Sequence, residues 1–108
     1  MNIEWQEVLI NTPGEILHRM GYTETIKLNN DTVIDVAYIP YNNDRYDIIE
    51  VSTGTAILFN KFFNNLIDAH NAITTPEMTK LIIEALKSPW AIECTSLIDK
   101  HKNGENIS

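Results

Sequence analysis

Residues 22–52 read YTETIKLNNDTVIDVAYIPYNNDRYDIIEVS. Three segments of this run are rich in β-branched and aromatic residues, which favour strands: 22–28, 32–39 and 45–52. Two Asn-rich clusters, 29–31 and 40–44, separate these segments and have the composition of tight turns. The sequence therefore predicts a small antiparallel meander over residues 22–54, and three strands suffice for a viable sheet.

Alternation along the predicted strands assigns the side chains to two faces, because successive residues of a strand point to opposite sides of the sheet. We expect one face to be buried and to carry the following apolar and aromatic side chains: Tyr22, Ile26, Ile34, Val36, Tyr38, Tyr46 and Ile48. The opposite face would carry Asp35 and Asp47 together with four apolar side chains: Val33, Ile39, Ile49 and Val51. This second face is predicted to mix acidic and apolar groups.

The residues before the meander have the features of helices. Trp5, Val8 and Leu9 have helical spacing, which predicts a first helix over residues 3–10. The sequence Thr-Pro-Gly-Glu at 12–15 has the order of a capping box, with a Thr N-cap, Pro at the first helical position and Glu at the third. A second helix that begins there would end at Gly21. We therefore expect residues 1–21 to be helical.

The residues after the meander are predicted to be mainly helical. Apolar residues at spacings of three and four favour a helix from about Phe59 onward, whereas residues 55–59 fit a fourth strand equally well. Thr75 and Ser88 each precede a Pro, and this order of N-cap and first helical residue predicts two further helices. Their expected core stripes are Met78, Leu81, Ile82, Ala85 and Leu86 in the first helix and Trp90, Cys94, Leu97 and Ile98 in the second.

The chain of 108 residues has the length of one domain. We predict a single α+β domain with four parts: a helical segment 1–21, a β-meander 22–54, a helical segment 55–103 and a loose tail 104–108. The expected architecture is a small antiparallel three- or four-stranded meander with short N-terminal helices and a C-terminal helical group packed on one face.

The composition indicates a soluble protein of a reducing compartment. A single cysteine, Cys94, excludes a disulfide within the chain. The N-terminus lacks the pattern of a signal peptide, and no window approaches the roughly 20 apolar residues of a membrane span. We therefore expect a cytoplasmic protein without membrane contact. The high content of Ile, Asn and Lys is what A/T-rich codons produce, which points to a low-GC bacterium or a phage.

No residue pattern in the sequence indicates a catalytic or cofactor site. His18, His70 and His101 lack the spacing of metal ligands, so no metal is predicted, and His70 is expected to be a partly buried structural residue. Cys94 has no basic cluster near it that would stabilise a thiolate. The glycines are too dispersed for a phosphate-binding loop. We expect no cofactor and no enzymatic activity; a divergent enzyme would require convergence in one pocket of at least two of Asp35, Asp47, Glu50 and His70.

Much of the net charge of −7 lies in the predicted sheet. Its acidic residues are Glu24, Asp31, Asp35, Asp44, Asp47 and Glu50. Its basic residues are Lys27 and Arg45, which offset only part of this negative charge. This charge opposes phosphate-neutralising contacts with nucleic acid and suits a protein partner with a basic surface around an apolar patch. The residues predicted to bind that partner are Asp31, Asp35, Asp44, Asp47, Glu50, Ile39, Ile49 and Val51.

These features predict a small acidic protein–protein interaction module, of the kind with which a phage or mobile element inhibits or adapts a basic, nucleic-acid-handling host protein. The alternative is a structural or assembly role, as a virion subunit, a tail-assembly chaperone or a subunit of a small homo-oligomer. In that alternative the apolar part of the mixed face would form the contact of a homodimer.

Overall fold

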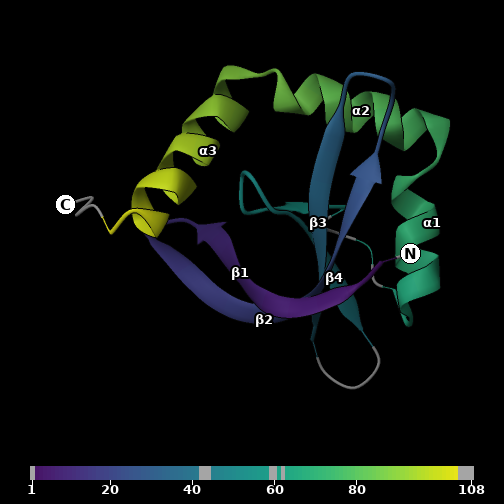
Figure 1. Cartoon of the computed structure of the whole chain (residues 1–108), viewed down its shortest axis with the longest axis horizontal. Helices are drawn as coiled ribbons and strands as arrows, with labels where there is room; N and C mark the ends of the chain where they lie inside the picture. Colours follow the sequence, from purple (N-terminus) through teal and green to yellow (C-terminus); the bar gives the residue numbers. More distant parts are fainter. Residues whose placement is uncertain (1, 42–44, 59–60, 62, 105–108) are drawn as a thin grey trace.

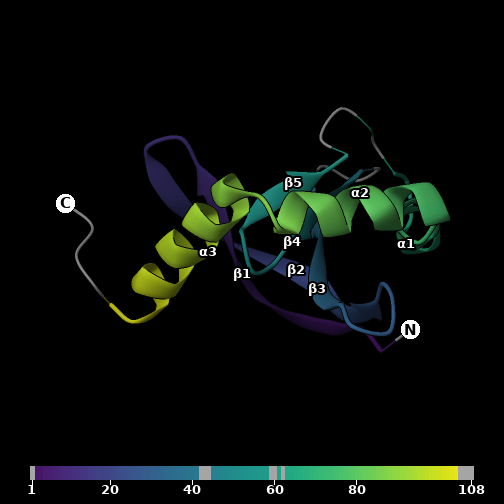
Figure 2. The ribbon, with the colours of Figure 1, turned by 90° about the horizontal axis from the view of Figure 1, so that it is seen from above.

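The computed structural model describes residues 2–41, 45–58, 61 and 63–104 of the chain. Within these residues, a five-stranded antiparallel sheet of order β1-β2-β3-β4-β5 precedes three helices, which form an arc around the sheet (Figure 1). The strands are β1 (Glu4–Thr12), β2 (Glu15–Lys27), β3 (Val33–Pro40), β4 (Tyr46–Glu50) and β5 (Thr55–Ile57). The helices are α1 (Leu66–Ile73), α2 (Pro76–Leu86) and α3 (Pro89–Lys102). From above, they follow one another along the molecule in the order α3, α2, α1 (Figure 2).

The N-terminal segment is a β-hairpin, so the predicted helices within residues 1–21 are wrong. All nine residues of β1 pair with β2. The sequence that resembles a capping box is the turn of this hairpin: Gly14 has a φ of 88°, and the Thr12 hydroxyl donates a hydrogen bond of 2.9 Å to the Glu15 carbonyl. Pro followed by Gly at positive φ favours a tight turn, and pairing along the whole hairpin outweighs the local helical spacing.

The predicted meander is confirmed as β2, β3 and β4, with β1 and β5 added at its two sides. The turn at 29–31 is closed by Asn29, whose Oδ1 accepts a hydrogen bond of 2.9 Å from the Asp31 N–H. In the second predicted turn, residues 42–44 lie outside the described residues. The predicted buried face is confirmed as well: Ile26, Ile34, Val36, Tyr38 and Ile48 form one buried cluster, against which Tyr22 and Tyr46 pack.

After the meander, residues 55–57 form a strand, which decides between the two alternatives for this segment. The predicted start of a helix at about Phe59 lies outside the described residues, but the continuation of that helix through Lys61 and residues 63–65 is wrong, because these described residues are not helical. Phe63 forms a β-bridge with Tyr46, and α1 begins at Leu66. The physical reason is the N-cap Asn65, whose Oδ1 accepts a hydrogen bond of 2.8 Å from the backbone N–H of Asp68.

The two predicted C-terminal helices are confirmed as α2 and α3. Thr75 and Ser88 are their N-caps, and each hydroxyl accepts a hydrogen bond of 3.2 Å from the N–H three residues on. The core stripes are narrower than expected, because Leu81 and Trp90 are 57% and 53% exposed. The buried residues of the two helices are Ile82 in α2 and Ala91, Cys94 and Ile98 in α3.

The face predicted to mix acidic and apolar groups is largely covered by the sheet itself. The sheet curls so that β1 contributes to a second buried cluster, which consists of Val8, Ala37, Ile39 and Ile49, with Ile10 and Val51 packed against it. Ile39 and Ile49 are 6% and 4% exposed, so the expectation that they lie open to a partner is wrong for these two side chains. Gly21 permits the close packing here, because a Cβ at that position would lie 2.5 Å from Ile39 Cδ1.

A backbone contact joins the two sides of the curled sheet. The Asn11 N–H donates a hydrogen bond of 2.7 Å to the carbonyl of Gly54, which directly precedes β5. Gly54 has a φ of 69°, and a Cβ there would lie 2.9 Å from the Leu9 carbonyl oxygen and 3.0 Å from Asn11 N. Glycine is therefore required both by the backbone conformation and by the close approach of β1.

Three polar side chains lie together in the main core. The carboxylate of Glu24 is 3% exposed and accepts a hydrogen bond of 2.8 Å from His70 Nδ1, so His70 is the partly buried structural residue that the sequence predicts. Glu24 Oε2 and the Tyr38 hydroxyl have no hydrogen-bond partner among the described residues. Burial, together with the nearby Glu24 carboxylate, raises the pKa of Tyr38 well above its usual range.

We expect Gly54→Ala to lower the free energy of unfolding by at least about 2 kcal/mol, because it combines an unfavourable φ with a backbone collision. Urea unfolding followed by circular dichroism measures this change. The matched control is Gly14→Ala, which shares the positive φ of 88° but has no atom within 4 Å of the added Cβ, so it should cost about 1 kcal/mol. Equal losses in the two variants would show that the contact with β1 is unimportant.

We expect Tyr38→Phe to change the free energy of unfolding at pH 7 by less than about 1 kcal/mol, since the lost hydroxyl has no partner among the described residues. Because the pKa of Tyr38 is raised on folding, its neutral form stabilises the fold fully below about pH 10, and this contribution is lost as the pH rises further. Urea unfolding at pH 7 and above pH 10 should therefore show a steeper alkaline loss in the wild type than in the variant. Identical slopes would contradict the assignment.

Candidate functional site

The acidic residues predicted to bind a partner lie in different environments. Asp35 lines a pocket on the concave face of the sheet, whereas Asp47 Oδ1 lies 3.8 Å from the Arg45 guanidinium Nε. Asp31 is exposed in the turn after β2, and Asp44 lies outside the described residues. Among the described residues, the acidic series therefore does not form one continuous surface.

Glu50 is buried, and its carboxylate accepts hydrogen bonds within the turn that follows β4. Its carboxylate accepts hydrogen bonds of 3.0 Å from the backbone N–H groups of Ser52 and Thr53. The Ser52 hydroxyl donates a further hydrogen bond of 2.7 Å to it. These contacts hold the turn that carries Gly54, and the residue is 3% exposed. A carboxylate that is satisfied within its own turn is not presented to a partner, so Glu50 lies outside the candidate site.

The pocket that contains Asp35 is acidic and polar. It has a volume of about 570 Å³ and is lined by Asn2, Glu4, Gln6, Thr23, Glu24, Thr25, Asp35 and Val51. Strand register places these residues together, because Glu4 lies opposite Thr23 and Thr25 lies opposite Asp35. Two of the lining residues, Glu4 and Asp35, are acidic and exposed, the carboxylate of Glu24 is buried against His70, and none of the described lining residues is Lys, Arg or His. The pocket can therefore accept a cationic group that also donates hydrogen bonds.

Hydrogen bonds within the pocket hold its polar side chains in place. The Thr25 hydroxyl donates to Asp35 Oδ1 at 2.6 Å. The Gln6 amide donates to the Thr23 hydroxyl, which in turn donates to the Glu4 carbonyl at 3.2 Å. Side chains that are already ordered lose less entropy when a ligand binds. Among the described residues, the second carboxylate oxygen of Asp35 accepts no hydrogen bond, so it is available to a ligand.

The sequence predicts Asp35 as a site residue but misses Glu4 and Gln6, which form the other wall of the pocket. They were assigned to a helix, so their position opposite β2 was not expected. The signal that identifies the hairpin is the Pro13-Gly14 pair between two apolar runs, because this dipeptide is a strong turn former.

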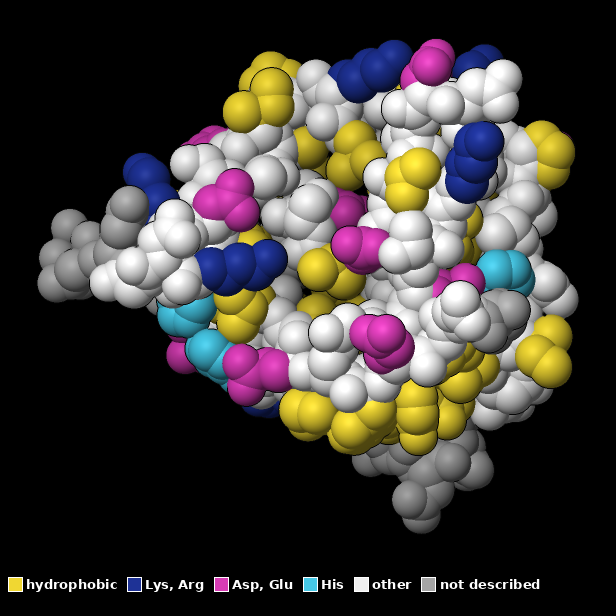
Figure 3. All heavy atoms as spheres, viewed as in Figure 1, with side chains coloured by type: hydrophobic (Ala, Val, Ile, Leu, Met, Phe, Trp, Pro, Cys, Tyr) yellow, Lys and Arg dark blue, Asp and Glu magenta, His cyan; other side chains and the backbone are white. Residues whose placement is uncertain are grey.

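A second, mainly apolar pocket of about 190 Å³ lies between β5, α2 and α3. Its lining includes Ile57, Leu81 and Trp90, and the last two are more than half exposed. Most Lys and Arg side chains on the face viewed in Figure 3 lie along its upper and left margins, where α2 and α3 are, whereas Asp and Glu extend across its middle. The acidic pocket on the sheet is therefore the better match to the charge of the chain.

A divergent enzyme would require at least two of Asp35, Asp47, Glu50 and His70 to converge in one pocket, but the four residues lie in different environments. Asp35 lines the acidic pocket, Asp47 contacts Arg45, Glu50 caps its turn and His70 binds Glu24. Cys94 is buried in α3, and burial, with a smaller contribution from Glu93, raises the pKa of its thiol. A raised thiol pKa disfavours the nucleophilic thiolate.

Two wider observations bear on the class of protein. Among the described residues, none of the helices combines the length and the apolar character that crossing a membrane would require. Comparison of the chain with protein-family models, with curated proteins and with solved structures found no match. The geometry of the acidic pocket is therefore the basis for a functional proposal.

Proposed function

We propose that this chain is a small acidic protein–protein interaction module that binds a basic surface of a nucleic-acid-handling protein and thereby inhibits or adapts it, as an accessory protein of a phage or mobile element would. The observation that carries the proposal is the pocket around Asp35, which has two exposed acidic residues, Glu4 and Asp35, and no basic residue among its described lining. A Lys or Arg side chain of the partner is the group that this pocket fits best.

The charge of the whole chain supports the same proposal. A net charge of −7 on 108 residues attracts a basic partner over distances of about a Debye length and speeds the encounter. A groove that binds nucleic acid presents Lys and Arg to phosphates, so a protein that presents carboxylates competes for it. Asp35 is central to this surface because Asp47 is already paired with Arg45 and Glu50 is buried.

A second candidate function is a structural or assembly role through self-association. A homodimer contact centred on Ile39 and Ile49 does not fit, because both side chains are buried within the chain. The observation that favours self-association is an exposed apolar group on β1 and β2, in which Trp5 is 51% and Met20 is 43% exposed. Trp5 also contacts Tyr22, with ring centroids 4.6 Å apart.

We expect a short peptide rich in Arg and Lys to perturb the NMR amide signals of Gln6, Thr23 and Asp35. Asp35→Asn should lower the affinity for the peptide about threefold, as expected for the loss of one solvent-accessible ion pair. Asp47→Asn is the matched control and should leave the affinity unchanged, because Asp47 is engaged by Arg45. Raising the salt concentration should weaken binding to the wild type. Equal effects of the two substitutions would contradict the assignment of the pocket.

We expect the purified chain to be monomeric in light scattering and to capture a nucleic-acid-binding protein from a lysate of a low-GC bacterium. Capture should persist with Asp47→Asn and be lost with Asp35→Lys, because the reversed charge repels a basic surface. The captured protein should lose DNA affinity when the chain is added. A concentration-dependent dimer that Trp5→Ser dissociates, with no charge-sensitive partner, would instead favour the assembly role.

A further inference from the structure

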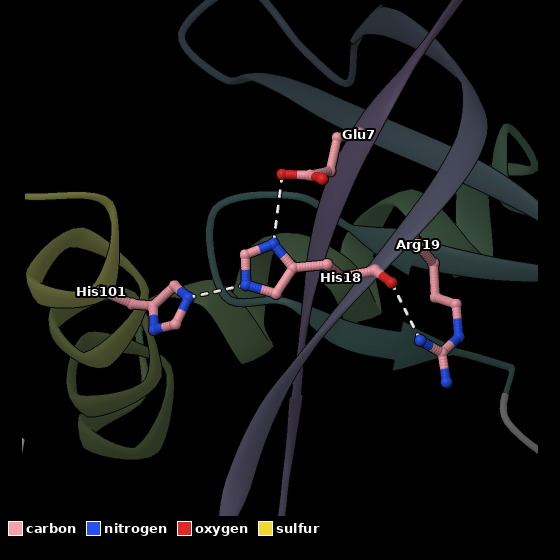
Figure 4. Close-up of polar contacts among 4 residues, drawn as sticks. All are labelled: Glu7, His18, Arg19 and His101. Atoms are coloured by element: carbon pink, nitrogen blue, oxygen red, sulfur yellow. Dashed lines mark hydrogen bonds and ion pairs between the residues drawn. The ribbon is translucent and has the colours of Figure 1, made fainter. Parts of the chain in front are cut away.

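Three side chains, from β1, β2 and α3, meet where the end of α3 contacts the β1–β2 hairpin (Figure 4). His18 of β2 and His101 in the last turn of α3 face each other, with their Nε2 atoms 2.9 Å apart. The other ring nitrogen of His18, Nδ1, lies 3.1 Å from Glu7 Oε1 of β1. Arg19 points away from this group and donates a hydrogen bond of 2.9 Å to the His18 carbonyl (Figure 4).

These contacts determine where the hydrogens of His18 lie. The Glu7 carboxylate accepts hydrogen bonds, so His18 Nδ1 carries the hydrogen of that contact. In neutral His18, Nε2 then presents a lone pair to His101. Two protonated imidazoles do not face each other at this distance, because two N–H donors and two positive charges would meet. The two Nε2 atoms are therefore arranged to share one electrophile, which is either a single proton or a metal cation.

The separation of the two nitrogens matches a pair of metal ligands. Imidazole nitrogens bind transition metals at about 2.0–2.1 Å, so two ligands at a right angle are about 2.9 Å apart and two at a tetrahedral angle about 3.3 Å apart. The observed 2.9 Å corresponds to adjacent ligands of a square-planar or octahedral ion. Imidazole is a good ligand for Cu²⁺, Ni²⁺ and Zn²⁺, and the first two of these ions take such geometries.

Glu7 supplies the support that a metal-binding histidine usually has. A carboxylate that accepts the hydrogen of the distal ring nitrogen fixes the tautomer and raises the basicity of the ligand nitrogen. The site is accessible, since the side chains of His18 and Glu7 are 49% and 61% exposed. Lys100 and Lys102 flank His101 in sequence, and neighbouring residues of a helix project about 100° apart.

We propose that His18 and His101 form a binding site for a divalent transition metal of the Cu²⁺ and Ni²⁺ class, with Glu7 as the residue that positions His18. Among the described residues no group of three or more His, Cys, Asp and Glu side chains is placed to hold a metal, so water completes the coordination of this two-histidine site. The ion ties α3 to β2 across 83 positions of sequence. Because the two ligands meet only in the folded chain, binding stabilises the fold.

The test is titration of the untagged protein with NiCl₂ and with CuSO₄, followed by calorimetry and by thermal unfolding. We expect one equivalent to bind and the Tm to rise until saturation, with reversal by EDTA. His18→Ala and His101→Ala should each weaken binding at least about 10-fold, and Glu7→Gln about 10-fold with unchanged stoichiometry. His70→Gln is the matched control and should leave metal affinity unchanged, because His70 contacts Glu24 in the core.

Electron paramagnetic resonance of the Cu²⁺ complex gives a readout that is independent of stability. We expect two nitrogen ligands in the wild type and one in each of the His18 and His101 variants. Metal-free unfolding curves of the same variants report whether they fold. Equal affinity of the wild type and His101→Ala, loss of binding in His70→Gln, or no binding at millimolar Ni²⁺ would overturn the proposal.

Discussion

The close approach of β1 to Gly54 is the constraint on which the shape of the molecule depends. The Asn11–Gly54 hydrogen bond of 2.7 Å holds the curled sheet together, and the absence of a side chain at Gly54 lets the two backbones meet. With β1 in this position, Val8 covers Ile39 and Ile49 and completes a second core on the concave face. A flat sheet of the same strands would leave these apolar residues exposed to water.

The acidic residues show why a count of charges is a poor guide to a binding surface. Glu24 is buried against His70, Glu50 caps the turn before β5, and Asp47 is paired with Arg45. Asp35 differs from these three because its partner Thr25 occupies one of its oxygens within an open pocket. Sequence gives all four residues the same formal charge, whereas burial and hydrogen bonding decide which carboxylate meets a partner.

The β1–β2 hairpin contributes to both of the proposed sites through its two faces. Glu4 and Gln6 of β1 line the acidic pocket. Glu7 lies on the opposite face of the same strand and contacts His18. Side chains alternate along a strand, so residues that are neighbours in sequence serve opposite surfaces. The described lining of the pocket comes from strands and from residues next to them, whereas the histidine pair requires the packing of α3 against the hairpin.

The sequence by itself determines the meander 22–54, its buried face and the start of α2 and α3, because alternation, Asn-rich turns and Ser or Thr before Pro are local signals. Residues 4–21 required the tertiary structure, because helical spacing and a Thr-Pro-Gly-Glu sequence are compatible with both a helix and a hairpin, and pairing with the meander favours the latter. The candidate sites, too, could be predicted from the sequence only in part. Asp35 follows from alternation, but the wall of Glu4 and Gln6, the burial of Ile39 and Ile49 and the meeting of His18 with His101 all depend on contacts between distant segments. Local sequence does not encode which distant backbones can approach closely, and that choice is made when the sheet curls and the helices pack against it.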